Sequence, residues 1–253
     1  MDRRMETIGV WAAPACLVLM LIGLWPMADL LPPPPAHDTA QQIASFYQHH
    51  TDLKRAGLLL CFIGCAGWAP LVAVLSRLMR RGGRDSLSFL QSISGTAAWM
   101  FLLLPFLILA VAAYRPYRPA STTQAIHDLG WITILIPFIP FVIQNIAIGL
   151  RVLTDPSATP LFPRWVGYLN FWVAFSFVPP GLLLFFKTGP FAYHSLFAFY
   201  LPLVTFAAWL TVMPWACHRA IRAESAADRS SEITSAERRP EASGPAAPQL
   251  LPR

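Results

Sequence analysis

Six long apolar segments fill most of the 253-residue chain and constrain its fold more than any short motif does. They span about Ile8–Leu31, Leu53–Leu78, Leu87–Ala113, Leu129–Val152, Trp165–Phe186 and Ser195–Cys217. Each is close to the roughly 20 apolar residues that cross ~30 Å of hydrocarbon. Only 13% of the residues are charged, against about a quarter in a soluble domain. The sequence therefore predicts a polytopic membrane protein.

The apolar runs predict helices. Backbone N–H and C=O groups in lipid must be hydrogen-bonded within the protein, which leaves helices or a closed barrel. Continuous apolar runs lack the alternation of barrel strands. We therefore expect an all-α bundle of six transmembrane helices, several of them kinked by proline. The first segment resembles a signal peptide, but its best cleavage site has Pro26 at the −3 position, so we expect it to stay uncleaved.

Basic residues set the expected orientation, because Lys and Arg favour cytoplasmic flanks. With the N-terminus inside, the inner flanks hold ten such residues and the outer flanks five. The segment Arg77–Arg84 contributes most of this bias. Both termini are thus predicted in the cytoplasm. The net charge of +6 is explained by the basic residues that flank the spans. Scattered basic residues do not indicate nucleic-acid binding.

The sequence predicts a membrane domain at 1–222 with one soluble insertion and a tail. The insertion, 32–52, opens with four prolines and continues into a short helix on the outer membrane surface, capped by Asp38 or Thr39. The tail, 223–253, is rich in Ala, Ser, Pro and charge, and such a composition buries too little apolar surface to offset ordering. We expect it to be disordered in the cytoplasm.

Prolines recur at one depth in four of the six predicted helices, roughly 10–18 Å below the outer surface at 1.5 Å per residue. They are Pro105, Pro137, Pro140, Pro179, Pro180 and Pro202. Bent helices separate where they bend, so the pattern predicts an outward-facing cavity. Its candidate lining is Trp99, Phe138, Phe175, Pro140 and Pro179. The alternative is that proline is simply frequent in membrane helices.

A second layer, near the cytoplasmic side, carries amides and hydroxyls. Its members are Ser94, Gln144, Asn145, Asn170 and Thr211. Polar side chains at one level are expected to hydrogen-bond between helices, at about 0.6 kcal/mol each. Gln144, Asn145 and Asn170 are also candidate ligand contacts, although structural hydrogen bonding is the favoured interpretation.

Five histidines fall on the predicted outer side, and imidazole is the commonest protein metal ligand. His127 and His194 stand where outer segments enter helices, and His49 or His50 could approach them from the surface helix. Asp128 could orient an imidazole or bind the metal itself. This set suggests a metal or haem site, against the simpler reading that interfacial histidines are solvated. The spacing matches no established metal signature.

The stretches AQQIASFYQHH, HDLGW, FPRWVGYLNFWVAF and VPPGLLLFFKTGPFAYHSLFAFYLP resemble a group of uncharacterised bacterial six-helix membrane proteins of similar length. That group has no established activity, so the resemblance implies a helix count and a bacterial inner-membrane location. It transfers no catalytic residue.

Two functions remain compatible with the sequence. The first is a protein that binds or transports a small lipophilic molecule through an outward-facing cavity. The alternative is a membrane redox enzyme, or an accessory subunit of one, that holds a metal or haem with its outer histidines. The chain shows no P-loop, GxSxG, GxGxxG or zincin motif, and no predicted span carries a charge near its centre. An enzyme is therefore the less expected class, and the lipid bilayer is the expected partner.

Overall fold

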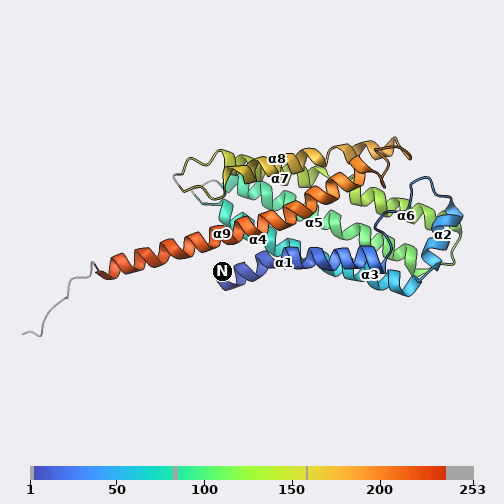
Figure 1. Cartoon of the computed structure of the whole chain (residues 1–253), viewed down its shortest axis with the longest axis horizontal. Helices are drawn as coiled ribbons and strands as arrows, with labels where there is room; N and C mark the ends of the chain where they lie inside the picture. Colours follow the sequence, from blue (N-terminus) through green and yellow to red (C-terminus); the bar gives the residue numbers. More distant parts are fainter. Residues whose placement is uncertain (1–2, 82–84, 158, 238–253) are drawn as a thin grey trace, which may run out of the picture.

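The computed structural model describes residues 3–81, 85–157 and 159–237. Within these ranges the chain is helical and contains no strand, which confirms the all-α fold (Figure 1). The α-helices are α1 (Arg3–Ile22), α2 (Ala40–Gln48), α3 (Thr51–Gly64), α4 (Trp68–Met79), α5 (Asp85–Tyr114), α6 (Ala120–Leu135), α7 (Ile139–Leu153), α8 (Arg164–Ser176) and α9 (Leu201–Glu237). Short π or 3-10 turns are η1 (Gly23–Met27), η2 (Cys65–Gly67), η3 (Pro179–Leu184) and η4 (Leu196–Tyr200).

Six helical segments are long and apolar enough to cross a membrane, in agreement with the six predicted spans. They are Arg3–Met27, Thr51–Met79, Asp85–Tyr114, Ala120–Leu153, Arg164–Leu184 and Leu196–Glu232. Five of them are composite. A π or 3-10 turn follows α1, joins α3 to α4, follows α8 and precedes α9, and a break separates α6 from α7. The architecture is that of a multi-pass membrane protein.

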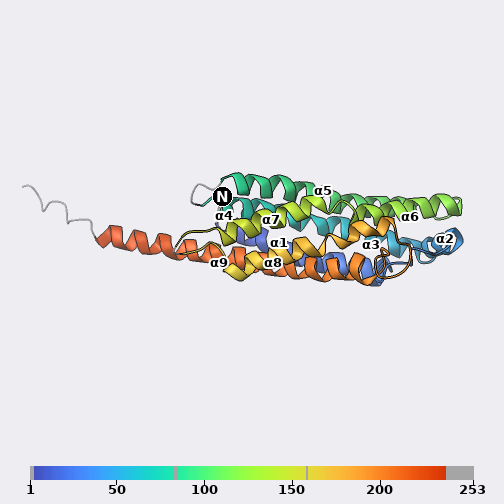
Figure 2. The same cartoon turned by 90° about the horizontal axis from the view of Figure 1, so that it is seen from above.

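The spans run side by side along the long axis of the molecule, as both views show (Figures 1 and 2). The helix α2 lies at one end of the bundle, and the N-terminus lies toward the other (Figure 1). We call these the α2 end and the N-terminal end; the sequence predicts that they face outward and inward, respectively. Side chains of α1, α4, α5, α7, α8 and α9 form one core cluster, and a second cluster lies nearer the α2 end.

The helices α1 and α3 approach so closely that glycine is required between them. A methyl group at Gly57 would lie 2.6 Å from the carbonyl oxygen of Gly23, and one at Gly64 would lie 2.9 Å from the carbonyl oxygen of Cys16. Backbone atoms cannot move aside as a flexible side chain can. Membrane helices lack a hydrophobic force between them, so such small-residue contacts carry much of their packing.

Gly57→Ala is therefore expected to separate α1 from α3 and to lower the free energy of unfolding by about 1–3 kcal/mol, the usual cost of overpacking. The measurement is the thermal unfolding midpoint of the purified protein in detergent. Gly9→Ala on α1 is the matched control, because its new methyl group would meet only the Cβ of Pro70, at 3.1 Å. Equal midpoints for the two variants would contradict this packing.

At the N-terminal end, an ion-pair network joins the first, second and last spans. Glu6, with only 2% of its surface exposed, accepts a hydrogen bond of 2.9 Å from Nη2 of Arg77, and the nearest N–O distance of this ion pair is 2.7 Å. Arg77 also lies 3.0 Å from Glu224, which pairs with Arg81 at 3.3 Å. A buried carboxylate is tolerated because it is paired.

The network changes the boundary predicted for the membrane domain. Residues 223–237 were predicted to be disordered, but in the structure they continue α9, and Glu224 belongs to the network. Asp228 forms a further ion pair with Arg3. The composition of this segment predicts disorder because it offers little apolar area to bury. Its contacts with the bundle are ion pairs, which a composition argument does not count. Residues 238–253 lie outside the described part of the chain.

Glu224→Gln is expected to destabilise the bundle by about 1–3 kcal/mol, because Arg77 and Arg81 lose a shared carboxylate. Arg222→Gln, an exposed change two residues away on α9, serves as the control. Thermal midpoints at low and high salt check both: the deficit of Glu224→Gln should shrink as salt screens the wild-type pairs. A deficit of the same size for Arg222→Gln would assign the effect to net charge.

Candidate functional site

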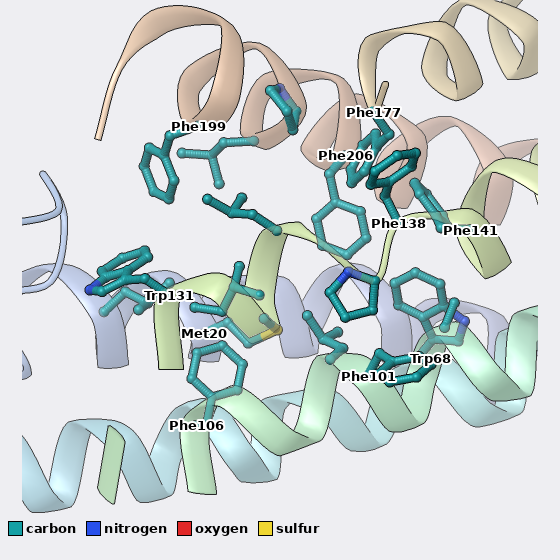
Figure 3. Close-up of a pocket in the computed structure, with 18 of the residues that line it drawn as sticks. Met20, Trp68, Phe101, Phe106, Trp131, Phe138, Phe141, Phe177, Phe199 and Phe206 are labelled. Carbon is teal, nitrogen blue, oxygen red and sulfur yellow. The ribbon is translucent and has the colours of Figure 1, made fainter. Parts of the chain in front are cut away.

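The bundle contains a partly open apolar cavity of about 140 Å³. All twenty lining residues are apolar or aromatic, and nine are aromatic: Trp68, Phe101, Phe106, Trp131, Phe138, Phe141, Phe177, Phe199 and Phe206. The rest of the lining comes from aliphatic and proline side chains of α1, α5, α6, α9 and the break between α6 and α7. Figure 3 shows Trp131 and Trp68 at opposite ends of this group of side chains.

The cavity forms where several helices are interrupted. The helix α6 ends at Leu135 and α7 begins at Ile139, and Pro137 between them lines the cavity. Pro202, which begins the regular turn after the π-helical η4, lines it as well. A proline removes one backbone donor, and its ring kinks or breaks the helix. Side chains near these breaks cannot close-pack as they would along continuous helices, and space remains between them.

The structure corrects most of the individual walls that the sequence predicted. Phe138 lines the cavity, but Pro140 and Pro179, each two residues beyond a phenylalanine of the lining, do not. Phe175 is 64% exposed and does not line the cavity. Trp99 is also absent from the lining, because its indole Nε1 donates to the carbonyl of Cys65 at 2.9 Å and the ring faces a different groove. The sequence does not specify the direction in which each of these side chains points.

An aromatic and polar layer separates the cavity from α2. The Trp131 ring lines the cavity and stacks on Tyr193, with centroids 5.6 Å apart. Behind it lies His127, one helical turn earlier on α6 and fully buried. The hydroxyl of Tyr47 in α2 lies 2.9 Å from Nδ1 of His127, and the hydroxyl of Tyr193 lies 3.4 Å from Nε2. The α2 end of the cavity is therefore closed.

Burial keeps this layer neutral. It raises the pKa of the Tyr47 hydroxyl, with smaller contributions from Tyr193 and Asp128, and it raises the pKa of Tyr193 in the same way. Both phenols thus retain their protons. A neutral imidazole has one donor and one acceptor nitrogen, so one phenol donates to His127 and the other accepts from it.

The metal site suggested by the sequence does not fit this geometry. Both ring nitrogens of His127 already face tyrosine hydroxyls, and Nδ1 of His194 accepts a hydrogen bond from the Ala36 backbone at 3.0 Å. The rings of His49 and His50 pack on each other instead of approaching His127. Across residues 3–81, 85–157 and 159–237, no three His, Cys, Asp or Glu side chains are grouped as metal ligands. His127, His194, His49, His50 and Asp128 therefore do not converge.

His194 fastens the proline-rich segment to the bundle instead. Burial lowers the pKa of His194, and the adjacent His37 lowers it further, while Asp38 opposes the shift. The two imidazole rings are 5.8 Å apart. Protonation of His194 would remove the acceptor that Nδ1 offers to Ala36 and place a charge beside His37.

Stability is therefore expected to fall under mild acid. A histidine whose folded-state pKa is lowered gives its full contribution above the unfolded value of about 6.5 and loses it as the pH falls below that value. The thermal midpoint of the wild type should drop between pH 7 and pH 5, and the drop should be smaller in His194→Gln. The exposed change His49→Gln is the control. Parallel pH profiles for wild type and His194→Gln would contradict the assignment.

The predicted polar layer lies on the other side of the cavity and takes no part in lining it. Asn170 accepts a hydrogen bond from the Trp209 indole at 3.0 Å, which joins α8 to α9 as expected for a structural contact. Gln144 is fully buried against Gly95 of α5, where a methyl group would lie 2.7 Å from its amide nitrogen. Asn145 donates to the carbonyl of Phe141 within α7. Thr211 is exposed and bonds only within α9.

Sequence reasoning missed Gln91 of α5. It is fully buried, and among the described residues neither its amide nitrogen nor its oxygen has a hydrogen-bond partner, as is also true of Gln144. A polar residue three positions from Ser94 on the same helix was the available signal. Gln91 lies about one helical turn nearer the N-terminal end than Ser94 does. It therefore does not share the depth by which the predicted polar layer was defined.

No family model, curated protein or solved structure matches this chain. The function is therefore argued from the geometry of the site. That geometry offers dispersion contacts and exclusion of water, but no acid, base or nucleophile among the lining side chains.

Proposed function

We propose that the protein is an integral membrane protein that binds a small lipophilic molecule in the cavity between its helices. The observation that carries the proposal is the wholly apolar, largely aromatic lining at the centre of an otherwise close-packed bundle. Apolar cavities of this kind exclude water and accept apolar guests, since water needs polar partners that such walls do not offer.

The volume indicates the size of the ligand. A cavity of ~150 Å³ lined by aliphatic and aromatic side chains is known to accept benzene. The cavity of about 140 Å³ here suits a single-ring aromatic compound or a stretch of hydrocarbon chain. It is too small for a drug-sized molecule, whose pockets run to roughly 300–1,000 Å³.

Access is proposed from the bilayer and not from outer water. The layer of Trp131, Tyr193 and His127 closes the α2 end, whereas Phe101 lines the cavity and is 38% exposed on α5. A lipophilic ligand already concentrates in hydrocarbon, so a lateral route avoids desolvating polar groups. Transport across the membrane would further require Trp131 and Tyr193 to separate.

The proposal includes the orientation that the basic residues predict. Arg77 of α4, together with Arg81 just beyond this helix, belongs to the ion-pair network at the N-terminal end, and Lys and Arg favour the cytoplasmic side. In this orientation α2 covers the cavity from the outside. The location proposed is a bacterial cytoplasmic membrane, following the family resemblance.

Fluorobenzene is a suitable probe, observed by fluorine NMR with the protein in lipid nanodiscs. Bound probe should give a second resonance, shifted by the aromatic walls. Ala98→Leu should abolish this resonance, because Ala98 lines the cavity and three added carbons fill it. The same change should leave the free protein as stable or up to about 2 kcal/mol more stable, as cavity filling does.

Ala97→Leu is the matched control, since Ala97 is adjacent on α5 and does not line the cavity. Partition of the probe into lipid is the same in all three samples, so only the cavity distinguishes them. A bound resonance that persists in Ala98→Leu, or that appears in no sample, would contradict the proposed site.

A further inference from the structure

A second hollow lies on the surface of the bundle between α4 and α5, separate from the central cavity. Its volume is about 370 Å³. One end carries Arg77 and Arg80, at the N-terminal end of the bundle, and the other reaches Trp99. Ala73 and Thr96, which line it, are exposed on the membrane-facing surface. We call this hollow the α4–α5 groove.

Small side chains create the groove. One wall of the groove is a single face of α4, on which Ala69 and Ala73 lie four residues apart and Arg80 lies seven residues further on. The opposite wall is α5, which contributes Ser92 and Thr96. From Arg80 to Ala69 the helix rises roughly 16 Å. The indole of Trp99, held by its hydrogen bond to Cys65, closes the deep end. The α4–α5 groove is therefore long enough to hold much of an acyl chain, and the arginines lie at the end opposite Trp99.

Of the two arginines, Arg80 is the one available to a ligand. Arg77 is paired with Glu6 and Glu224, and Arg81 is paired with Glu224. Arg80 is exposed and lies over the Phe89 ring at 5.7 Å, and it forms no ion pair within the part of the chain that the structure describes. Its guanidinium is thus oriented by Phe89 but not neutralised.

We propose that the α4–α5 groove binds an anionic phospholipid, with the phosphate at Arg80 and one acyl chain along Ala73 and Ala69 toward Trp99. The groove changes from cationic to apolar over the distance that separates a headgroup from mid-bilayer, as an amphiphile requires. Basic pockets between helices at one membrane face are typical sites for anionic headgroups. A second helix would fit the small residues, but it would leave Arg80 without a countercharge.

The test uses the purified full-length protein in nanodiscs of phosphatidylcholine doped with phosphatidylglycerol. A phosphatidylglycerol with a spin label near the middle of one acyl chain should quench fluorescence at the groove, where Trp99 lies. Native mass spectrometry should count phosphatidylglycerol retained after detergent release. Arg80→Gln should weaken retention about fivefold, the effect of one basic residue near a membrane surface. Ala73→Leu, which fills the groove, should reduce both retention and quenching.

Two controls keep the result specific. Arg219→Gln removes another exposed arginine that lies over a tryptophan ring, Trp215, on α9. Ala15→Leu adds the same bulk at an exposed position of α1 outside the groove. Both controls should retain phosphatidylglycerol like the wild type, and thermal midpoints of all four variants should establish that each is folded.

Three outcomes would overturn the proposal. Equal losses of retained phosphatidylglycerol in Arg80→Gln and Arg219→Gln would show that retention depends on the general surface charge and not on the groove. Retention that depends on Arg80 but not on Ala73 would show a headgroup contact without an acyl groove. Loss of a dimer in Ala73→Leu, with lipid retention unchanged, would show that a second copy occupies the groove. Success or failure of the fluorobenzene experiment has no bearing on this result, because the two sites share no residue.

Discussion

The requirement that every backbone polar group in hydrocarbon be satisfied from within the protein determines most of this structure. It requires the six spans to be helices. Each proline in the interior of a helix leaves one carbonyl of the preceding turn without its helical hydrogen bond, because a proline has no backbone N–H. Regular α-helix is interrupted at Pro137, between α6 and α7, and at Pro179, where η3 begins. The cavity lies beside two such irregular sites, since Pro137 and Pro202 line it. The packing of the helices and the cavity between them thus have one origin.

The structure also separates the roles of polar groups by depth. Beyond the cavity, toward α2, His127 is saturated by two phenols, while on the other side Asn170 joins α8 to α9. Neither arrangement leaves a reactive group facing the cavity. The Glu6–Arg77–Glu224 network, at the N-terminal end, buries the carboxylate of Glu6, and every member of the network has a partner of opposite charge. These features fit a protein that holds a ligand by shape and apolar contact.

The sequence predicted the spans well because length and hydropathy are properties of a segment as a whole. It also placed α2, since Thr39 and Gln42 form the reciprocal capping box at its start and Ile43 and Tyr47 share its buried face. It could not orient side chains within the spans. Where every face of a helix is apolar, no periodicity marks the inward side, so Phe175 and Phe138 look equivalent until neighbouring helices are known. The same limit applies to His127 and His194, whose common side was predicted but whose partners were not.

The position of Glu224 has a consequence for how the protein is made. Arg77 belongs to the second span, and Glu224 lies near the end of the sixth, so 147 residues separate the two partners. Spans are synthesised in order, and the first two can pair through Glu6 as soon as both have been inserted. The remaining carboxylate arrives only with the last helix. Completion of the ion network therefore requires insertion of all six spans, and a product truncated before Glu224 would leave Arg81 without its carboxylate partner and Arg77 with Glu6 alone.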